Sequence, residues 1–333
     1  MWLQVGSAEG LRLIVGGLTV IERRLRELAA RGVRQVIVVA EPVAVNVRGI
    51  DVSFEPGAVP PEGDRVERGD EIAGVIVRDD ETRAAAEWAL LRRINKSFEG
   101  PVDALVNSKI SMRITRVLAK TRLTPNHVTL AAIVLGLVAA AFVRGGSYWP
   151  AAIGGVLIEL NSILDSCDGE LARLRFQFSK LGQWLDNVGD DIVDNVFILC
   201  AGYGAGGPWM WIAIAAAVSR WMVAAGTYWI VYKKTGTGDV FSFRYWFESE
   251  KETAEEVYEL TSVAAWIRSF GRRDTYVFGW MLVCVAGLSF GVVVWGGIIA
   301  LINLPIFIAH LAVSATAREP EAAAVRAESV RGE

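Results

Sequence analysis

The chain has 333 residues, 53% of them hydrophobic, and a formal net charge of -3. This near-neutral charge gives no reason to expect a nucleic-acid partner, and the three cysteines are too few for a disulfide framework and lack zinc-site spacing. The composition then changes along the chain. Residues 1 to about 100 mix charged and apolar residues, whereas long apolar stretches follow from His127 onward. We therefore expect one soluble domain and one membrane domain.

The first 95 residues alternate between strand-like and helix-like patterns. The patterns predict strands over 12–16, 35–40, 49–54 and 73–78, and helices over 19–31 and from Asp79 or Asp80 to Arg93. The stretch Glu55–Asp70 is rich in proline, glycine and charge and is predicted to be a loop. Strands and helices in this order predict a small α/β domain over residues 1–95.

Residues 96–124 precede the first long apolar stretch and carry a basic amphipathic pattern. Basic residues between Lys96 and Arg122 are interleaved with apolar ones: Lys109, Arg113, Arg116, Lys120 and Arg122. Such a helix is expected to lie on an anionic membrane surface. The alternative interpretation is a solvated linker helix.

Six apolar segments follow, each close to the ~20 residues that span a bilayer. They cover 127–143, 149–172, 184–203, 207–232, 275–294 and 296–316. Lysine and arginine collect in alternate connections, after the second and fourth segments and at both ends, while the opposite face has only Arg144. The fold class is therefore predicted to be a mostly α membrane protein. It is an integral bundle of six transmembrane helices over 125–317, preceded by the small soluble α/β domain, with both termini cytoplasmic.

Two charged segments lie outside the predicted spans. The insertion 236–270 is predicted to be a cytoplasmic loop with an amphipathic helix, and the Ala-rich, charged stretch 318–333 is predicted to be a flexible tail.

Four aspartates carry the strongest chemical signal. Asp165 and Asp168 are three residues apart at the end of the second segment, and Asp186 and Asp190 are four apart at the start of the third. Each pair shares one face of its helix, so we expect a connection of about ten residues to bring all four together at the cytoplasmic end of the bundle.

Four carboxylates near a hydrocarbon layer require compensating charge, which hard divalent cations supply. Oxygen-rich sites of this kind suit Mg²⁺, Mn²⁺ or Ca²⁺, and we expect a pair of divalent cations, Mg²⁺ or Mn²⁺. Gly169 and Ala172 leave space where a nucleotide can press against the helix, and Arg173 can bind its phosphate. The alternative is a purely structural role, in which the aspartates cap helices or form ion pairs. This role explains Asp165 or Asp168 alone better than all four aspartates together.

The pattern Asp-x2-Asp-Gly-x2-Ala-Arg-x8-Gly-x3-Asp-x3-Asp resembles the signature of the CDP-alcohol phosphotransferase family at every position, and the stretch Thr124–Thr129 is similar to that family's usual approach to the first span. The resemblance covers residues 100–316. It implies a six-helix fold and, in many members, a homodimer.

By this resemblance the four aspartates and their neighbours receive separate roles. Asp165, Asp168 and Asp186 ligate metal, and Asp190 is the general base and a further metal contact. Gly169, Ala172, Arg173 and Gly182 contact the CDP-linked donor, and the reaction releases CMP.

Three arginines outside the motif are candidates for binding the acceptor. Arg220 lies within the fourth segment, and Arg272 and Arg273 precede the fifth. Such a cluster suits an alcohol that carries a phosphate, such as inositol phosphate. The alternative is ordinary positive charge on the cytoplasmic side.

Further polar residues stand inside the spans. Asp191 and Asp194 are predicted either to support the site or to join helices, and Glu159 and Asn161 to form structural hydrogen bonds within the bundle.

The stretch from Gly17 to Val33, followed by Val36–Val39, resembles the early part of sugar-phosphate nucleotidyltransferases. The phosphate-binding loop of that family is absent upstream, which predicts a degenerate, non-catalytic domain.

These features together predict phospholipid biosynthesis in a cell membrane. The donor is CDP-diacylglycerol or an archaeal equivalent, the acceptor is a small polar alcohol, and the site faces the cytoplasm. One alternative is a soluble CDP-inositol-type donor that gives a soluble phosphodiester. An alternative of another class is a cation transporter whose aspartates bind the permeating ion.

Overall fold

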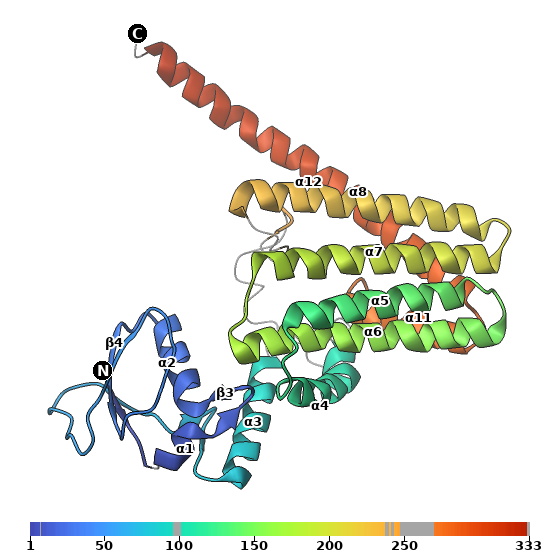
Figure 1. Ribbon diagram of the computed structural model, residues 1–333. Helices are drawn as coiled ribbons and strands as arrows, with labels where there is room; N and C mark the ends of the chain where they lie inside the picture. Colours follow the sequence, from blue (N-terminus) through green and yellow to red (C-terminus); the bar gives the residue numbers. More distant parts are fainter. Residues whose placement is uncertain (7, 96–100, 237–239, 241–242, 247–269, 332–333) are drawn as a thin grey trace. The chain divides into compact units, whose positions relative to one another are not determined.

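The computed structural model describes residues 1–333 except 7, 96–100, 237–239, 241–242, 247–269 and 332–333 (Figure 1). The chain divides into two compact units. The first comprises Met1–Glu99, Ser108–Pro125 and Ser166–Phe178, and the second comprises Gly100–Asn107, Asn126–Asp165 and Ser179–Glu333. The C-terminal end of one long helix therefore belongs to the same unit as the N-terminal residues.

A four-stranded parallel sheet forms the centre of the first unit. Its strand order is β5-β4-β1-β6, with β1 at Trp2–Gln4, β4 at Gln35–Val39, β5 at Asp51–Phe54 and β6 at Val66–Arg68. In register, Leu3 of β1 lies opposite Val38 of β4 and Glu67 of β6. Leu3 and Val38 are fully buried, as expected for the central strands of a parallel sheet.

Three helices and two short hairpins complete the α/β part. The helices are α1 (Ala8–Arg12), α2 (Val20–Ala30) and α3 (Asp80–Asn95), and the hairpins pair β2 (Ile14–Val15) with β3 (Leu18–Thr19) and β7 (Glu71–Ile72) with β8 (Val75–Ile76). Thr19 starts α2 through a capping box: its side chain accepts from the Glu22 amide, and the Glu22 side chain accepts from the Thr19 amide.

The helices predicted over 19–31 and from Asp79 or Asp80 are confirmed as α2 and α3, and the strand predicted over 35–40 is confirmed as β4. The loop prediction for 55–70 was wrong in part, because Val66–Arg68 pairs with β1. The strand predicted over 12–16 is limited to Ile14–Val15.

The basic segment before the first apolar helix is helical in two parts. A π-helical turn covers Asp103–Asn107, and α4 covers Ser108–Leu118. The buried residues of α4 are the small polar Ser108, Ser111 and Thr115, so its basic and apolar residues lie on the more exposed sides.

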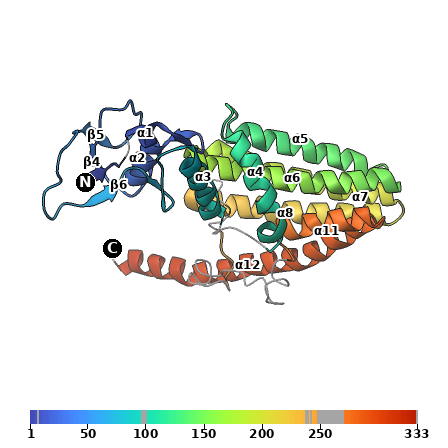
Figure 2. The same cartoon turned by 90° about the horizontal axis from the view of Figure 1, so that it is seen from below.

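The helical part contains α5 (Pro125–Val143), α6 (Tyr148–Arg175), α7 (Lys180–Ala205), α8 (Trp209–Thr235), α11 (Arg273–Val285) and α12 (Phe290–Arg331). Helices α5 to α8 run side by side (Figures 1 and 2), and α12 packs against α7, α8 and α11. Small residues allow close approach: a Cβ on Gly189 of α7 would stand 2.4 Å from Ile133 Cδ1 of α5. Phe197 and Trp280 stack in the core with ring centroids 5.6 Å apart.

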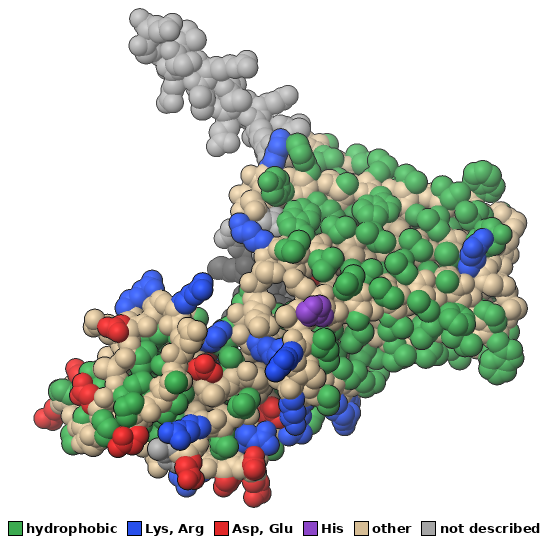
Figure 3. All heavy atoms as spheres, viewed as in Figure 1, with side chains coloured by type: hydrophobic (Ala, Val, Ile, Leu, Met, Phe, Trp, Pro, Cys, Tyr) green, Lys and Arg blue, Asp and Glu red, His purple; other side chains and the backbone are tan. Residues whose placement is uncertain are grey.

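Among the described residues, three helices are long and apolar enough to cross a membrane. They are Pro125–Val143, Trp209–Thr235 and the Phe290–Ser314 part of α12. The face of the helical part that Figure 3 shows is largely apolar. Trp149, Trp211 and Leu301 are more than 70% exposed, which suits contact with lipid rather than water.

The predictions for the α6–α7 link, for residues 318–333 and for the insertion 236–270 compare differently with the structure. The link between α6 and α7 is shorter than the ten residues expected, because α6 continues as helix to Arg175. The backbone of α12 is helical to Arg331, whereas the composition predicted a flexible tail over 318–333. Alanine and glutamate favour helix in this stretch. The amphipathic helix predicted within 236–270 falls mainly on 247–269, outside the described residues.

Candidate metal centre and adjoining cavity

The end of α6 and the start of α7 carry the four motif aspartates. Asp165 and Asp168 lie one turn apart on α6, and Asp186 and Asp190 lie one turn apart on α7. The turn between the helices contains Phe176, which has a φ of 54°. Ser179 then caps α7 by accepting a hydrogen bond from the Gly182 amide at 2.9 Å.

Three of these aspartates converge. Asp165, Asp168 and Asp186 each offer a carboxylate oxygen, and these oxygens lie within 4.8 Å of one another. Asp168 is buried and the other two are half-buried. Three carboxylate oxygens at this spacing form the donor set that hard divalent cations prefer, so the residues present fit Mg²⁺ or Mn²⁺.

Asp190 stands outside that group and is linked to it by an arginine. Arg273, in the first turn of α11, donates to Asp165 Oδ2 at 2.8 Å and lies 3.0 Å from Asp190 Oδ1. Its guanidinium also donates to Asn161 Oδ1 at 3.0 Å and lies 3.6 Å from Asp194. One guanidinium thus partly neutralises several carboxylates, which compensates part of the negative charge gathered here.

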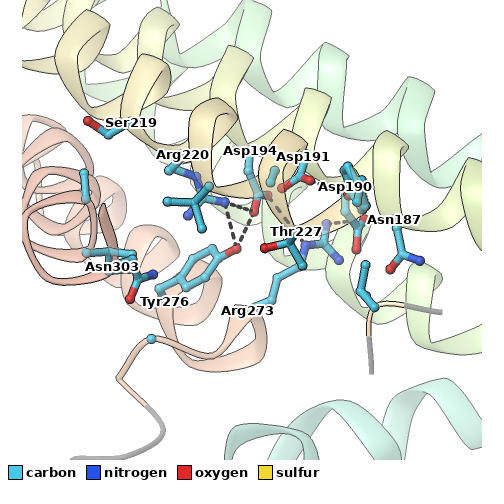
Figure 4. Close-up of a pocket in the computed structure, with 17 residues that line it drawn as sticks. Asn187, Asp190, Asp191, Asp194, Ser219, Arg220, Thr227, Arg273, Tyr276 and Asn303 are labelled. Atoms are coloured by element: carbon cyan, nitrogen blue, oxygen red, sulfur yellow. Dashed lines mark hydrogen bonds and ion pairs between the residues drawn. The ribbon is translucent and has the colours of Figure 1, made fainter. Parts of the chain in front are cut away.

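A cavity of about 350 Å³ adjoins Arg273 (Figure 4). Its polar lining comes from α7, α8, α11 and α12 and includes Asn187, Asp190, Asp191, Asp194, Ser219, Arg220, Thr227, Tyr228, Arg273, Tyr276 and Asn303. Of the four motif aspartates, only Asp190 is among the lining residues. Asp190 is therefore the motif carboxylate that a molecule in this cavity meets.

A buried polar network stabilises the floor of the cavity. Figure 4 shows Arg220 and Tyr276 directed at Asp194. The Arg220 guanidinium donates to Asp194 at 3.0 Å and to the Tyr276 hydroxyl at 3.2 Å, and Tyr276 donates to the same carboxylate. Nearby, Tyr228 donates to Asp191 at 2.5 Å. Asp191 and Asp194 therefore join helices while also lining the cavity, which combines the two roles left open by the sequence.

The three arginines expected at the acceptor separate in the structure. Arg220 and Arg273 line the cavity, whereas Arg272 is not among its lining residues and lies 3.3 Å from Asp274. The interpretation of Asn161 as a structural residue is supported, because its side chain also donates to the Ala132 carbonyl on α5 at 2.8 Å.

The residues expected at the donor differ in how much space surrounds them. A Cβ on Gly169 would stand 3.2 Å from an Arg173 guanidinium nitrogen, so Arg173 covers this glycine. A Cβ on Gly182 would stand 2.8 Å from Ser179 Oγ and 2.9 Å from Asn126 Oδ1. A side chain at 182 would therefore displace Ser179 Oγ, which caps α7, or the Asn126 side chain, whatever the donor contacts.

Sequence analysis did not predict several of the residues that line the cavity, among them Thr227, Tyr228, Tyr276 and Asn303. Tyr276 had a detectable signal, because it follows Arg273 by three residues and so shares its helix face. Asn303 lies in a long apolar stretch, where a lone amide is a weak signal.

Comparison with known proteins gives one family model and several relatives. The family model described as CDP-alcohol phosphatidyltransferase matches residues 122–302. A bifunctional IPC transferase and DIPP synthase from Aquifex aeolicus is 34% identical over 132 residues, which cover 38% of this chain and 30% of that protein. The protein of the same name from Archaeoglobus fulgidus is 28% identical over 213 residues, which cover 62% of this chain and 36% of that protein.

A third relative has a different name. The inner membrane protein YnjF from Escherichia coli is 33% identical over 126 residues, which cover 38% of this chain and 52% of that protein. The chain spans about a third of the length of the bifunctional relatives that it matches.

Proposed function

Because the chain belongs to the CDP-alcohol phosphatidyltransferase family, we propose that it transfers a substituted phosphate from a CDP-linked donor to a small polar alcohol. The alcohol oxygen forms a bond to the phosphorus that carries the substituent, the bond from that phosphorus to CMP breaks, and CMP leaves. The observation that carries the proposal is the convergence of Asp165, Asp168 and Asp186, linked through Arg273 to a polar cavity.

Asp165, Asp168 and Asp186 are the proposed ligands of two divalent cations, Mg²⁺ or Mn²⁺, with Asp190 as a further contact. Bound cations of this kind would neutralise the pyrophosphate and stabilise negative charge on departing CMP. The mutual spacing of the three carboxylates, of which Asp168 is buried and the other two are half-buried, supports this role.

Asp190 is the proposed general base. A base must come within hydrogen-bond reach of the acceptor hydroxyl, and Asp190 lines the cavity while the other three motif aspartates do not. In this role its carboxylate accepts the hydroxyl proton as the new bond to phosphorus forms.

Arg220 and Arg273 are the proposed contacts for a phosphate on the acceptor, such as that of inositol phosphate. Both guanidinium groups reach the cavity, where Asn187, Thr227 and Asn303 can hydrogen-bond a polyol. The proposal rests on these two arginines and gives Arg272 no direct contact. The proposed donor contacts are Gly169, Ala172, Arg173 and Gly182, and the Arg173 guanidinium lies close to Gly169, where it can bind a phosphate.

The proposed setting is a six-helix membrane domain over 125–317 formed by α5, α6, α7, α8, α11 and α12. Three of these helices are apolar enough by themselves. Helices α6 and α7 are less apolar because they carry the aspartates, and α11 has 13 residues. Lysine and arginine on one side favour cytoplasmic termini and a cytoplasmic site.

The active form is proposed to be a homodimer. The domain over 1–95 is proposed to be non-catalytic, and the juxtamembrane segment 96–124 joins it to the membrane domain.

The donor is proposed to be CDP-diacylglycerol or its archaeal equivalent, which would place the chain in phospholipid biosynthesis. A soluble CDP-inositol-type donor is the second candidate. The relatives' names, IPC transferase and DIPP synthase, do not name a phospholipid product, which favours keeping this alternative.

One experiment separates the two donors. Purified full-length protein in detergent is incubated with Mg²⁺ or Mn²⁺, each donor in turn, and inositol 1-phosphate, inositol, glycerol 3-phosphate or serine. CMP release with CDP-diacylglycerol and a product that enters organic solvent supports the lipid reaction. Release only with CDP-inositol, with a product that stays in water, selects the second candidate.

A further inference from the structure

The C-terminal end of α6, which carries the proposed donor contacts, belongs to the first compact unit together with the α/β domain. We infer that this domain holds the donor-binding end of α6 in place, and that Arg23 of α2 is the positioning residue. The inference deepens the proposed function and rests on it for the identity of the donor. Helix α2 and residues 166–178, which include the end of α6, belong to the same compact unit.

The end of α6 has carbonyl groups that its own helix cannot satisfy. Phe176 adopts a left-handed conformation, and the Gln177 amide turns back to donate to the Ala172 carbonyl at 2.9 Å. This hydrogen bond satisfies one of the carbonyls as in a Schellman motif. The residue in the left-handed position is a phenylalanine rather than the usual glycine. Such a turn is costly for a residue with a side chain, so further contacts are needed to hold it.

Two arginines of α2 supply those contacts. Arg23 donates to the Leu174 carbonyl at 2.6 Å, and Arg26 donates to the Arg175 carbonyl at 3.4 Å. The Arg23 guanidinium also lies 5.8 Å from the centroid of the Phe176 ring. Cations at a helix C-terminus are favourable because they oppose its negative dipole end. Arg23 therefore contacts the backbone of the turn at Leu174 and the side chain of Phe176, the residue with left-handed backbone conformation.

Arg23 is a costly residue to keep in this place. Its side chain is 1% exposed, and its hydrogen bonds within the α/β part go to the carbonyls of Val15 and Gly16. Burial lowers the pKa of Arg23 to about 10, so the group stays charged at neutral pH. A buried charge whose hydrogen bonds go to carbonyl dipoles is expensive, and for core packing alone an apolar residue would serve at least as well.

The β2–β3 turn fits against the same helix end. A Cβ on Gly16 would stand 2.9 Å from Leu174 Cδ2, and one on Gly17 would stand 2.8 Å from Arg175 Nε. Both glycines have positive φ. The pair thus lets the turn approach α6 more closely than side chains would allow.

The other side of the donor stretch is held as well. Glu170, next to Gly169, is 2% exposed and accepts from Asn95 of α3 at 2.8 Å and from Ser111 of α4 at 2.5 Å. Helices α2, α3 and α4 therefore fix residues 170–176 from several directions. Loss of this support would let the helix end move and weaken donor binding, while the acceptor cavity, which belongs to the second unit, would keep its affinity.

The test compares Arg23→Met with Arg24→Met in the full-length protein. Arg24 is the matched control, because it lies on the same helix and pairs with Glu27 at 2.9 Å and Glu67 at 3.0 Å, away from α6. We expect Arg23→Met to weaken CMP binding and raise the donor KM by about tenfold, as for loss of a charge-assisted hydrogen bond. The acceptor KM and kcat should stay within about twofold, and Arg23→Lys should recover part of the loss.

Amide hydrogen exchange over residues 173–178 provides a readout that does not depend on the donor. Exchange should accelerate in Arg23→Met and not in Arg24→Met. Equal rises of the donor KM in both variants, or unchanged exchange in Arg23→Met, would overturn the inference. If Arg23→Met does not fold, Asn95→Ala carries the same expectations and the same contrary outcomes. If the wild type neither binds nor releases CMP, the proposed function fails, and the exchange data still decide whether the domain holds the turn.

Discussion

Arg273 donates to Oδ2 of Asp165 at 2.8 Å and so joins two residues that are 108 positions apart in the sequence. The same guanidinium lies 3.0 Å from Asp190. It therefore occupies oxygens on two of the carboxylates proposed to contact metal. A metal ion and this arginine compete for the same negative charge.

Replacing Arg273 with methionine should strengthen metal binding. Removal of the competing guanidinium is expected to lower the Mn²⁺ dissociation constant about threefold or more, in line with the ~1 kcal/mol of a part-exposed ion pair. The affinity for a phosphorylated acceptor should fall at the same time. Mn²⁺ titration followed by electron paramagnetic resonance measures the first effect. Arg273→Lys, which keeps the charge, is the control, and weaker Mn²⁺ binding in the methionine variant would contradict the competition.

Asp168→Asn should weaken metal binding directly. Asp168 is the buried member of the converging group, and loss of one ligand carboxylate should reduce Mn²⁺ affinity by more than the ~10-fold typical of outer-shell changes. Asp191→Asn is the matched comparison, because Asp191 lies on α7 and hydrogen-bonds Tyr228 outside that group. Equal Mn²⁺ affinities for the two variants would argue against Asp168 as a ligand.

Asp190→Asn should remove turnover more than binding. An amide cannot accept the hydroxyl proton, so kcat should fall by ~10²–10⁴-fold while CMP affinity stays close to wild type. Steady-state CMP release and equilibrium CMP binding measure the two quantities separately. Undiminished kcat would mean that another group takes the proton.

Glu67 predicts how the α/β domain responds to acid. Its carboxylate lies 2.6 Å from Arg31, and this hydrogen bond, together with Arg65 and Arg24, lowers the pKa of Glu67 from 4.5 to about 2. Because the folded-state pKa is the lower one, ionised Glu67 stabilises the fold above about pH 4.5, and that contribution disappears as the pH falls toward 2. Glu67→Gln should therefore be destabilising at pH 7 and progressively less so below pH 4.5.

Thermal unfolding of Glu67→Gln and of wild type at several pH values measures this difference. Exposed Glu55 provides the control substitution, Glu55→Gln. A difference between Glu67→Gln and wild type that grows as the pH falls would contradict the sign of the argument.

The sequence predicted the long elements and the metal-binding candidates well, because both leave local patterns. Apolar runs located α5, α6, α7 and α8, but the segment predicted over 275–294 runs across the break between α11, which ends at Val285, and α12, which begins at Phe290. All four motif aspartates were predicted to come together, and the structure brings together Asp165, Asp168 and Asp186. Helical geometry relates residues within one helix, as for Asp165 and Asp168, whereas the approach of Asp186 also depends on the short connection that packs α7 against α6.

The short strands at the edges of the pattern could not be predicted in the same way. Strands β1 and β6 have three residues each, and Val66–Arg68 is surrounded by charge. Their pairing depends on a partner strand that lies about sixty residues away, which no local periodicity records. The extent of α6 was missed for a similar reason, because Arg23 and Arg26 satisfy its last carbonyls from a distant part of the chain.

The cavity was predicted only in part. Arg220 and Arg273 were found as charges in or near apolar segments, but their present partners, Asp194, Tyr276 and Asp165, come from other helices. Which charges meet is decided by helix packing. The sequence therefore predicted the charged groups but not their ion pairs.

The central claim is a metal-dependent transfer that releases CMP, and CMP release by the purified chain tests it most directly. Each reaction contains a CDP-linked donor and an alcohol, with and without divalent cation, and with the alcohol omitted as a control. We predict release that requires both the cation and the acceptor. No release with any donor and acceptor, accompanied by cation flux into liposomes that contain the protein, would contradict it.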